Sequence, residues 1–334
     1  MAKVGIGVVG CGGMGMALAQ GVAGLESAAV VAAYDAAPER AEALAAKHGG
    51  RACRDYAELL GDPAVGAVVV ASPQFAHAEN TIAAAEAGKH VFCEKPMAVT
   101  LEDCDAMIAA CSQAGVKLMI GQVCRYHAVH GKVRELVRSG EFGRPVCMTV
   151  HRLGGPWGGA YTQEWRFRRE GCGGTILEIH AHEIDFMRWV CGDVEAVYTA
   201  GGLYVDKRLD YPDLALVTLH FASGAKGLLH TGQVSAIGGY GGRVDCEGGS
   251  LVFPSFWGAE AGIHVARMGQ KPAFLPASEL KVEDPVRHEL RDFVESILGD
   301  TAPPVPGAEG RAVVEIGVAA YQSLDCGEAV PLPL

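Results

Sequence analysis

The sequence lacks several features that would place it in a specialised class of protein. Among its 334 residues no apolar run approaches the ~20 residues that a membrane-spanning helix needs. Its eleven cysteines form no Cys-x-x-Cys pair and no zinc-finger spacing, so we expect reduced, mostly structural thiols. Apolar residues make up 49% of the chain, too many for a disordered protein. We therefore expect a globular protein without a membrane anchor.

Positive charge is also scarce. Lysine and arginine number 28 against 39 aspartate and glutamate residues, which gives a net charge of −11. Binding of nucleic acid needs a clustered basic surface that releases counterions, so we expect no nucleic-acid partner. The first residues enter a strand pattern directly, without a charged and apolar leader, and we expect a cytoplasmic protein.

The first third of the chain alternates short β-branched runs with alanine-rich helical stretches. This alternation favours a parallel sheet wrapped by helices, because each connection is long enough for a helical crossover. The predicted strands are 4–9, 29–34, 65–71, 90–93 and 118–121, and the predicted helices are 14–25, 38–48, 76–87 and 101–114.

From about residue 122 the pattern changes to strands separated by hairpin breakers, which predicts a mostly antiparallel sheet. The expected strands are 146–153, 194–203, 214–221, 224–234, 243–247 and 250–253, and the expected helices are 129–139, 175–190, 285–298 and 308–324. The length suits two domains of the usual ~100–200 residues. We place an α/β domain at residues 1–122 and an α+β domain at 123–334, whose last two helices can pack back on the first domain.

A glycine-rich segment stands where the first predicted strand ends and the first helix begins. Residues 10–15, Gly-Cys-Gly-Gly-Met-Gly, match the pattern GxGxxG. In that pattern the first glycine permits a tight turn, the second lets backbone approach a pyrophosphate, and the third allows close packing of helix on strand. The helix N-terminus offers unpaired N–H groups to the phosphates. The segment therefore predicts dinucleotide binding by Gly10, Gly12, Gly13, Met14 and Gly15.

An acidic residue at the end of the second predicted strand indicates which cofactor binds. Asp35 follows Gly15 at the spacing that this kind of site requires. A carboxylate there accepts hydrogen bonds from the ribose hydroxyls and repels a 2′-phosphate, which favours NAD over NADP. Arg40, in the next helix, can stack on adenine or meet a 2′-phosphate, so NADP remains the alternative.

Two further turns fall at the carboxyl end of the predicted parallel sheet, where open α/β folds bind ligands. One holds Ser72 and Pro73, with His77 in the helix that follows, and the other is Glu94-Lys95-Pro96. The proline restricts the backbone of Lys95. From these residues alone, a solvated surface lysine is the simpler interpretation.

Together these segments resemble the successive signatures of the glucose-fructose oxidoreductase and inositol dehydrogenase family, known as Gfo/Idh/MocA. The likeness runs through residues 10–15, 72–77 and 87–96 and continues at 121–126 and 173–174, so it covers nearly the whole chain. The Glu-Lys-Pro triplet is its most specific mark. The resemblance implies a Rossmann domain followed by an open, mainly antiparallel sheet. It also implies that the motif's lysine, Lys95, contacts both the substrate and the nicotinamide ribose.

The second catalytic signature of this family, Asp-x-x-x-His after a glycine-rich segment, matches residues 171–185 with Glu178 in place of the aspartate. In a strand, Glu178, His180 and His182 would share a face and resemble a metal site. In a helix, Glu178, His182 and Asp185 share a face beside an apolar stripe, and the apolar spacing favours the helix without a metal. The resemblance makes His182 the expected proton carrier and Glu178 a substrate or orienting contact.

The remaining site residues are assigned by the resemblance alone. His151 and Tyr240 resemble positions that touch polyol hydroxyls, with a loop histidine and a packing tyrosine as the alternative. Trp165-Arg166 resembles a pair near the nicotinamide, and a solvated hairpin tip is equally consistent. The expected substrate contacts are Lys95, Arg125, His151, Glu178, His182 and Tyr240. The expected cofactor contacts are the glycine loop, Asp35, Arg40, Ser72, Pro73, His77, Glu94, Lys95, Gln122, Trp165 and Arg166.

These expectations lead to one function and two alternatives. We expect reversible hydride transfer between nicotinamide and a secondary hydroxyl of a sugar, inositol or related cyclic polyol, with Lys95 and His182 converging on one alcohol. The alternatives are an NAD-dependent glycosidase, of the kind that a branch of the same family resembles, and a non-catalytic NAD(H) sensor. By analogy with the family, we expect a homodimer or homotetramer.

Overall fold

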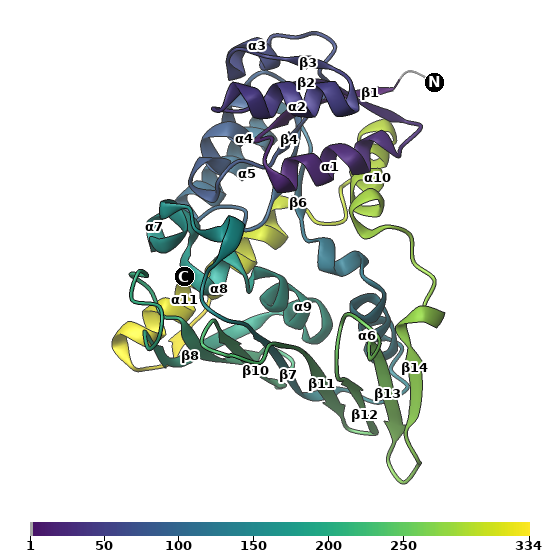
Figure 1. Ribbon diagram of the computed structural model, residues 1–334. Helices are drawn as coiled ribbons and strands as arrows, with labels where there is room; N and C mark the ends of the chain where they lie inside the picture. Colours follow the sequence, from purple (N-terminus) through teal and green to yellow (C-terminus); the bar gives the residue numbers. More distant parts are fainter. Residues whose placement is uncertain (1–2) are drawn as a thin grey trace. The chain divides into compact units, whose positions relative to one another are not determined.

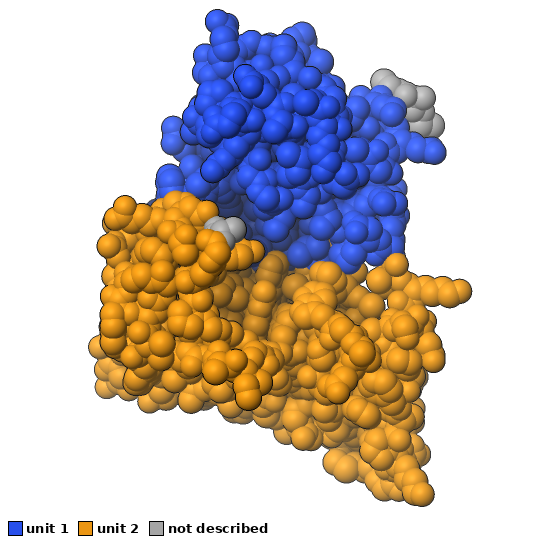
Figure 2. Space-filling model, in the orientation of Figure 1, with its two compact units in different colours: residues 1–123, 283–312 blue, residues 124–282, 313–334 orange. Residues whose placement is uncertain are grey.

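The structure, a computed structural model, describes residues 3–334 apart from the side chain of residue 160. The chain divides into two compact units, coloured separately in Figure 2. Unit 1 comprises the residues up to Val123 together with Glu283–Ala312, and unit 2 comprises Cys124–Val282 and Val313–Leu334. Residues 283–312, from the expected second domain, thus belong to unit 1.

Unit 1 is built on a six-stranded parallel sheet. Its strands are β1 (Val4–Val9), β2 (Ala28–Tyr34), β3 (Arg51–Ala52), β4 (Ala67–Val70), β5 (His90–Glu94) and β6 (Leu118–Gly121). The order is β3-β2-β1-β4-β5-β6, so the direction of winding reverses between β1 and β4, as in a Rossmann fold. Every residue of β4 is buried, as a parallel sheet covered by helices requires. The carboxyl ends of β1 and β4 therefore form the edge where such sheets bind ligands.

Helices pack around this sheet (Figure 1). They are α1 (Gly13–Ala23), α2 (Pro38–His48), α3 (Tyr56–Leu60), α4 (His77–Glu86), α5 (Leu101–Ala114) and α10 (Pro285–Leu298). Local sequence explains several of their ends. Thr100 accepts a hydrogen bond from the Asp103 N–H to begin α5, and Asp284 accepts one from the Arg287 N–H to begin α10. Gly115, at φ 65°, ends α5 in the left-handed conformation.

Helix α10 comes from far along the chain and packs beside α1 (Figure 1). Gly21 permits this approach, because a Cβ there would lie 2.8 Å from Leu290 Cδ1. On the inner side Phe293 meets Phe92 of β5, with ring centroids 5.8 Å apart. Each fully buried side chain of this kind contributes roughly 2 kcal/mol. The C-terminal segment is therefore part of the core of unit 1.

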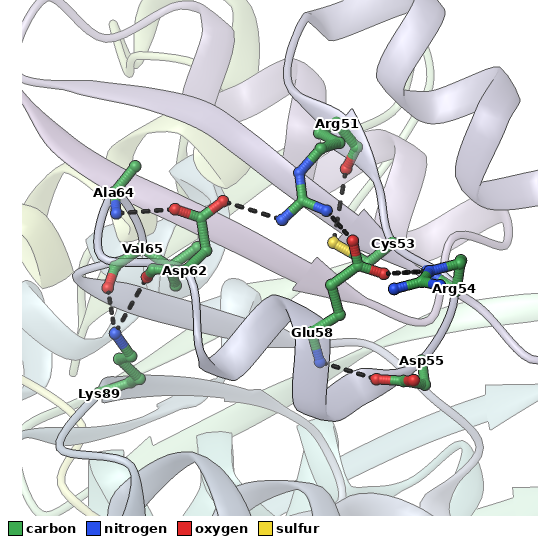
Figure 3. A network of polar contacts seen from close by, with 9 residues as sticks. All are labelled: Arg51, Cys53, Arg54, Asp55, Glu58, Asp62, Ala64, Val65 and Lys89. Carbon is green, nitrogen blue, oxygen red and sulfur yellow. Dashed lines mark hydrogen bonds and ion pairs between the residues drawn. The ribbon is translucent and has the colours of Figure 1, made fainter.

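The sequence analysis did not predict β3 and α3, which a polar network holds in place (Figure 3). Arg51 forms ion pairs with Glu58 and Asp62. Asp55 caps α3 by accepting a hydrogen bond of 2.7 Å from the Glu58 N–H. The Lys89 ammonium donates to the Asp62 carbonyl group at 3.2 Å. Because both elements are too short to show a periodic pattern, tertiary contacts define them.

Unit 2 is built on a nine-stranded sheet in the order β14-β13-β12-β11-β7-β10-β9-β8-β15. Its strands are β7 (Pro145–Leu153), β8 (Val194–Gly202), β9 (Leu214–Phe221), β10 (Lys226–Gly232), β11 (Gly239–Cys246), β12 (Gly249–Phe253), β13 (Gly262–Arg267), β14 (Ala273–Pro276) and β15 (Val330–Pro331). Among the strands of this sheet that the structure describes, only β7 and β10 pair in parallel, which confirms the mostly antiparallel sheet. Strands β13, β14 and β15 were not predicted. Strand β11 starts earlier than predicted, so Tyr240 lies in the strand and not in a preceding loop.

Helices of unit 2 lie on one face of this sheet and leave the opposite face open (Figure 1). They are α6 (Ala128–Arg138), α7 (Arg169–Cys172), α8 (Gly174–Glu178), α9 (Ala181–Cys191) and α11 (Gly307–Cys326), which begins among residues of unit 1. The core lies between the sheet and α6 and α9, and includes Met148 and Phe186. On the open face, Tyr198, Leu216 and Leu228 are 40%, 40% and 38% exposed.

The helix predicted over residues 175–190 is interrupted in the structure. Helix α8 ends at Glu178 and α9 begins three residues later, so Glu178 and His182 do not lie on one continuous helix. Gly174, at φ 67°, starts α8 in the left-handed conformation, and a Cβ there would lie 2.1 Å from the Tyr321 hydroxyl. Packing of Gly174 against Tyr321 thus fixes where α8 begins. The apolar spacing that predicted one continuous helix does not capture this tertiary contact.

All eleven cysteines are free thiols, and most are buried. Burial raises the pKa of Cys11 to about 12 and that of Cys191 to about 12, so these thiols are protonated and unreactive. Within residues 3–334 no helix has the length and apolar character needed to cross a bilayer.

Candidate functional site

The glycine loop between β1 and α1 has the backbone geometry that a bound pyrophosphate requires. Gly10 has φ 87°, and a Cβ there would lie 2.4 Å from the Ser72 nitrogen. At Gly15 a Cβ would lie 1.9 Å from the Gly10 carbonyl oxygen. Gly12 and Gly13 instead face open space, with no atom within 4 Å of an added Cβ. The outer glycines thus serve the turn and the packing, and the middle ones leave room for phosphate at the N-terminus of α1.

Asp35 is anchored at the end of β2 by backbone groups. Its Oδ2 accepts a hydrogen bond of 2.7 Å from the Cys11 N–H, and its Oδ1 accepts one of 2.9 Å from the Ala37 N–H. A carboxylate has about four lone-pair positions, so acceptor capacity remains for ribose hydroxyls. Arg40 lies 4.0 Å from Oδ1 with a side chain that is 60% exposed. Met14, in the first turn of α1, is also exposed. The Asp35 carboxylate, which is held by backbone N–H groups and can still accept hydrogen bonds from ribose hydroxyls, therefore fits NAD.

His77 connects two of the predicted turns from inside unit 1. Ser72 and Pro73 form the turn after β4, and His77 Nε2 lies 2.9 Å from the Ser72 carbonyl oxygen. The other ring nitrogen, Nδ1, lies 2.9 Å from the carbonyl oxygen of Pro96 in the turn after β5. The ring is almost fully buried, and burial lowers its pKa. Because both nitrogens face carbonyl groups of the protein, we assign His77 to support of these turns, in place of the expected cofactor contact.

The Glu-Lys-Pro turn follows β5 and combines a buried carboxylate with a half-buried lysine. The Glu94 carboxylate accepts a hydrogen bond of 3.1 Å from the Lys95 N–H. Gln122 directly follows β6, the neighbouring strand, and is 1% exposed. Its amide oxygen has no hydrogen-bond partner within the described residues. A buried acceptor of this kind at the carboxyl edge of the sheet suits a donor group of the cofactor.

Helix α9 carries His182 in its first turn and Asp185 one turn later. The Arg125 guanidinium donates two hydrogen bonds to Asp185, of 2.8 Å from Nε to Oδ2 and 2.6 Å from Nη2 to Oδ1. The two side chains are 8% and 1% exposed. Paired donors of this kind make strong and directional contacts. Arg125, expected to contact substrate, thus binds α9 within unit 2.

A second buried charge cluster lies at the start of α9. Glu183 Oε1 is 3.2 Å from Arg152 Nη1, and its Oε2 is 2.9 Å from His180 Nδ1. The Arg152 guanidinium lies 5.0 Å from the centre of the Tyr240 ring, whose hydroxyl is 3.1 Å from His130 Nε2. Burial acts to raise the pKa of Glu183, yet the Arg152 charge and the His180 hydrogen bond hold this pKa well below its usual value. Glu183 is therefore ionised.

His151 and Arg152 are neighbours in β7 and lie on opposite faces of its sheet. Arg152 reaches Glu183 on the covered face, whereas His151 pairs in register with His230 on the open face. Burial and the neighbouring His230 lower the pKa of His151. The structure thus places His151 on the face of the sheet opposite the α9 cluster, and its expected contact with substrate stays a prediction. Arg152, which the sequence analysis passed over, lies on the face of the sheet that carries the α9 cluster.

Glu178, at the end of α8, pairs with Arg166. Arg166 Nε donates to Glu178 Oε1 at 2.9 Å, and the guanidinium stacks 4.0 Å from the centre of the Trp165 ring. This segment forms the 3₁₀ turn η4 (Glu164–Phe167) and is not a hairpin tip, and the Arg166 side chain is 17% exposed. In the part of the chain that the structure describes, no group of three His, Cys, Asp or Glu side chains is arranged to hold a metal ion.

The chain matches models of two protein families. Residues 4–122 match the oxidoreductase family with an NAD-binding Rossmann fold, and residues 130–252 match the GFO/IDH/MocA C-terminal domain. The chain belongs to the GFO/IDH/MocA family. As a member of this family it is an NAD-dependent oxidoreductase, and the Rossmann domain that the resemblance implied is confirmed.

Relatives in the GFO/IDH/MocA family are similar to the chain along its length. The myo-inositol 2-dehydrogenase of Thermotoga maritima is 31% identical over 335 residues, which cover 98% of each chain. The 1,5-anhydro-D-fructose reductase of Ensifer adhaerens is 31% identical over 309 residues, which cover 91% of each chain. The crystal structure of aldose-aldose oxidoreductase from Caulobacter crescentus aligns with a TM-score of 0.88 at 28% identity, over 99% of this chain and 100% of that one.

Proposed function

We propose that this protein transfers a hydride between NAD and a secondary hydroxyl group of a sugar, inositol or related cyclic polyol. The observation that carries the proposal is the similarity to a myo-inositol 2-dehydrogenase over 98% of both chains, with Lys95 and His182 present. The relatives named for an anhydro sugar and for aldoses support the broader substrate class.

NAD supplies the redox chemistry by accepting or returning the hydride. In unit 1, the N–H groups at the start of α1 bind the pyrophosphate, and Asp35 accepts hydrogen bonds from the ribose hydroxyls. The buried amide oxygen of Gln122 accepts a hydrogen bond from the cofactor. His77 holds the two neighbouring turns and keeps the backbone of Lys95 in place.

His182 and Lys95 divide the work at the reacting oxygen. Histidine ordinarily titrates at a pKa of ~6.5, so an imidazole can take the hydroxyl proton during oxidation and return it during reduction. His182 performs this role in the proposal. The Lys95 ammonium donates a hydrogen bond to the same oxygen and stabilises the negative charge that develops on it.

The remaining polar groups of unit 2 orient the substrate. Arg166 holds the Glu178 carboxylate in one orientation, which lets the longer glutamate serve where relatives of this pattern have aspartate. The Tyr240 hydroxyl is engaged with His130, so we assign Tyr240 to support of Arg152 and not to direct contact with a sugar.

Turnover of a substrate panel tests the proposal. Inositols, aldoses, anhydrosugars and aryl glycosides are each mixed with the protein and NAD, and NADH formation is followed by absorbance. Stoichiometric NADH with a polyol or sugar is the expected result. Hydrolysis of an aryl glycoside without net NADH would assign the protein to the glycosidases, and NADH binding without any turnover would assign it to the sensors.

A further inference from the structure

Glu183 is an acidic residue of α9 that no step of the proposed reaction uses. It directly follows His182 in the first turn of the helix, and its side chain is 0% exposed. An ionised carboxylate in the interior costs several kcal/mol unless it is paired and hydrogen-bonded. The Glu183 carboxylate is buried next to His182, the proposed proton carrier, despite this free-energy cost, which suggests that its charge has a function.

Two groups from different parts of unit 2 fix the orientation of this carboxylate. Arg152 approaches one oxygen from β7, and His180, the residue that precedes α9, approaches the other at 2.9 Å. Because a carboxylate accepts hydrogen bonds, His180 carries its proton on Nδ1. Both oxygens of Glu183 are therefore engaged, and the first turn of α9 is held from two sides.

Three other titratable groups near Glu183, which are Tyr240, Cys124 and His130, are neutral at ordinary pH. Burial and the Glu183 charge raise the pKa of Tyr240, on β11, well above its usual value. Burial likewise raises the pKa of Cys124, and it lowers the pKa of His130, on α6, well below the usual histidine value. The charge that faces Glu183 from the sheet is that of Arg152.

We propose that Glu183 is a positioning residue for His182, which fixes the first turn of α9 and places a permanent negative charge beside the imidazole. This inference rests on the proposed role of His182. The nearby Asp185 differs, because the Arg125 guanidinium engages both of its oxygens, whereas Arg152 contacts one oxygen of Glu183. A fixed negative charge stabilises the protonated imidazole, which is the form that donates a proton during carbonyl reduction.

The electrostatic coupling between these neighbours supports the inference. Burial acts to raise the pKa of Glu183, the Arg152 charge lowers it most, and His180 and then His182 lower it further. Such an interaction is mutual, because the energy between two charges belongs to both groups. His182 and Glu183 are adjacent in the first turn of α9, so the carboxylate charge acts on the imidazole at short range, and Arg152 compensates that charge through its pair with one carboxylate oxygen.

Two substitutions with opposite effects on charge test the proposal. Glu183→Gln keeps the shape of the side chain and removes its charge, and we expect the acidic limb of the kcat/KM profile to move to lower pH by about half a unit or more. Arg152→Gln removes the positive partner, and we expect the same limb to move to higher pH. A purely structural role would shift both profiles alike or shift neither.

A matched control is Asp193→Asn, which removes a charge from a residue that is 76% exposed just beyond the far end of α9. Its profile should coincide with that of the unmodified protein. NMR titration of labelled His182 measures the midpoint of its protonation directly, without turnover. It is carried out on the unmodified protein and on each folded variant. An unmoved His182 midpoint in a folded Glu183→Gln or Arg152→Gln protein would overturn the inference. Near-normal turnover of His182→Ala would instead overturn the proposed function on which it rests.

Discussion

Arg125 holds Asp185 with two hydrogen bonds of 2.8 and 2.6 Å, one helical turn beyond His182 on α9. Both side chains are buried, so each charge relies on the other for the interactions that water would provide. Residues three apart on a helix lie on one face, and the pair therefore fixes the face of α9 that carries His182.

Breaking this pair should destabilise the protein. Asp185→Asn leaves the Arg125 charge buried without its partner, and we expect the free energy of unfolding to fall by about 3 kcal/mol or more. Urea denaturation measures the change. Asp325→Asn, at a site that is 75% exposed, is the control and should stay within about 0.5 kcal/mol. A loss no larger than that of the control would mean that the pair does not hold α9.

Loss of either proposed reacting group should remove turnover while cofactor binding persists. We expect Lys95→Met and His182→Ala each to lower kcat by roughly 100-fold or more, because each removes an interaction that is strongest in the transition state. Fluorescence titration should show that both variants still bind NADH. Lys47→Met, at an exposed lysine of α2, controls for loss of a positive charge. Near-normal turnover in either variant would exclude that residue from the mechanism.

Cofactor choice should depend on Asp35. We expect a lower KM for NAD than for NADP, because the anchored carboxylate accepts ribose hydroxyls and repels a 2′-phosphate. Asp35→Ser should raise the KM for NAD by about tenfold, since hydrogen bonds to a charged acceptor are lost. The same change should lower the KM for NADP. A clear preference of the unmodified protein for NADP would contradict this role.

Stability should depend on pH through Glu289 of α10. This carboxyl group is buried, and neither oxygen has a hydrogen-bond partner in the described part of the chain. Burial, followed by the charges of Glu94 and Asp284, raises its pKa well above the usual value. The stability that this group contributes is fully present below its unfolded pKa of ~4.3 and is lost as the pH rises through the raised folded value.

Substitution of Glu289 tests this dependence, because Glu289→Gln stays neutral at every pH. We expect the Tm of the variant to exceed that of the unmodified protein at alkaline pH, and the difference to shrink as the pH falls toward ~4. Glu295→Gln, on the same helix but 64% exposed, should show no such trend. Parallel Tm curves for Glu289→Gln and the unmodified protein would mean that Glu289 is not buried as described.

We propose that the open face of the sheet in unit 2 packs against a second copy of the chain. Tyr198, Leu216 and Leu228 are exposed on three adjacent strands of this face, and an uncovered apolar surface favours association. Leu228→Lys should convert a dimer or tetramer to a smaller species in sedimentation velocity. Leu298→Lys, at an exposed leucine of α10, is the control. A monomeric unmodified protein would refute the proposal.

Several features could be predicted because their signals are local. The glycine loop and Asp35 fall within one strand-turn-helix-strand unit, where spacing along the chain sets spacing in space. The alternation of side chains along β7 also predicts which face of the sheet each of its residues lies on. Val150 is buried on the covered face, so Arg152 shares that face and His151 does not. The expected role of His151 came from the resemblance, whereas the period of two along the strand predicts which face of the sheet it lies on.

The sequence by itself determined the two kinds of sheet, the nucleotide-binding turn and the family, since each depends on short patterns of residue type and spacing. Tertiary structure alone decided the break between Glu178 and His182, the burial of His77 between two carbonyl groups and the pairing of Glu183 with Arg152. Those outcomes depend on partners that lie distant in the chain. A buried charge or helix end takes its conformation from whichever group the fold brings to it, and no local pattern encodes that group.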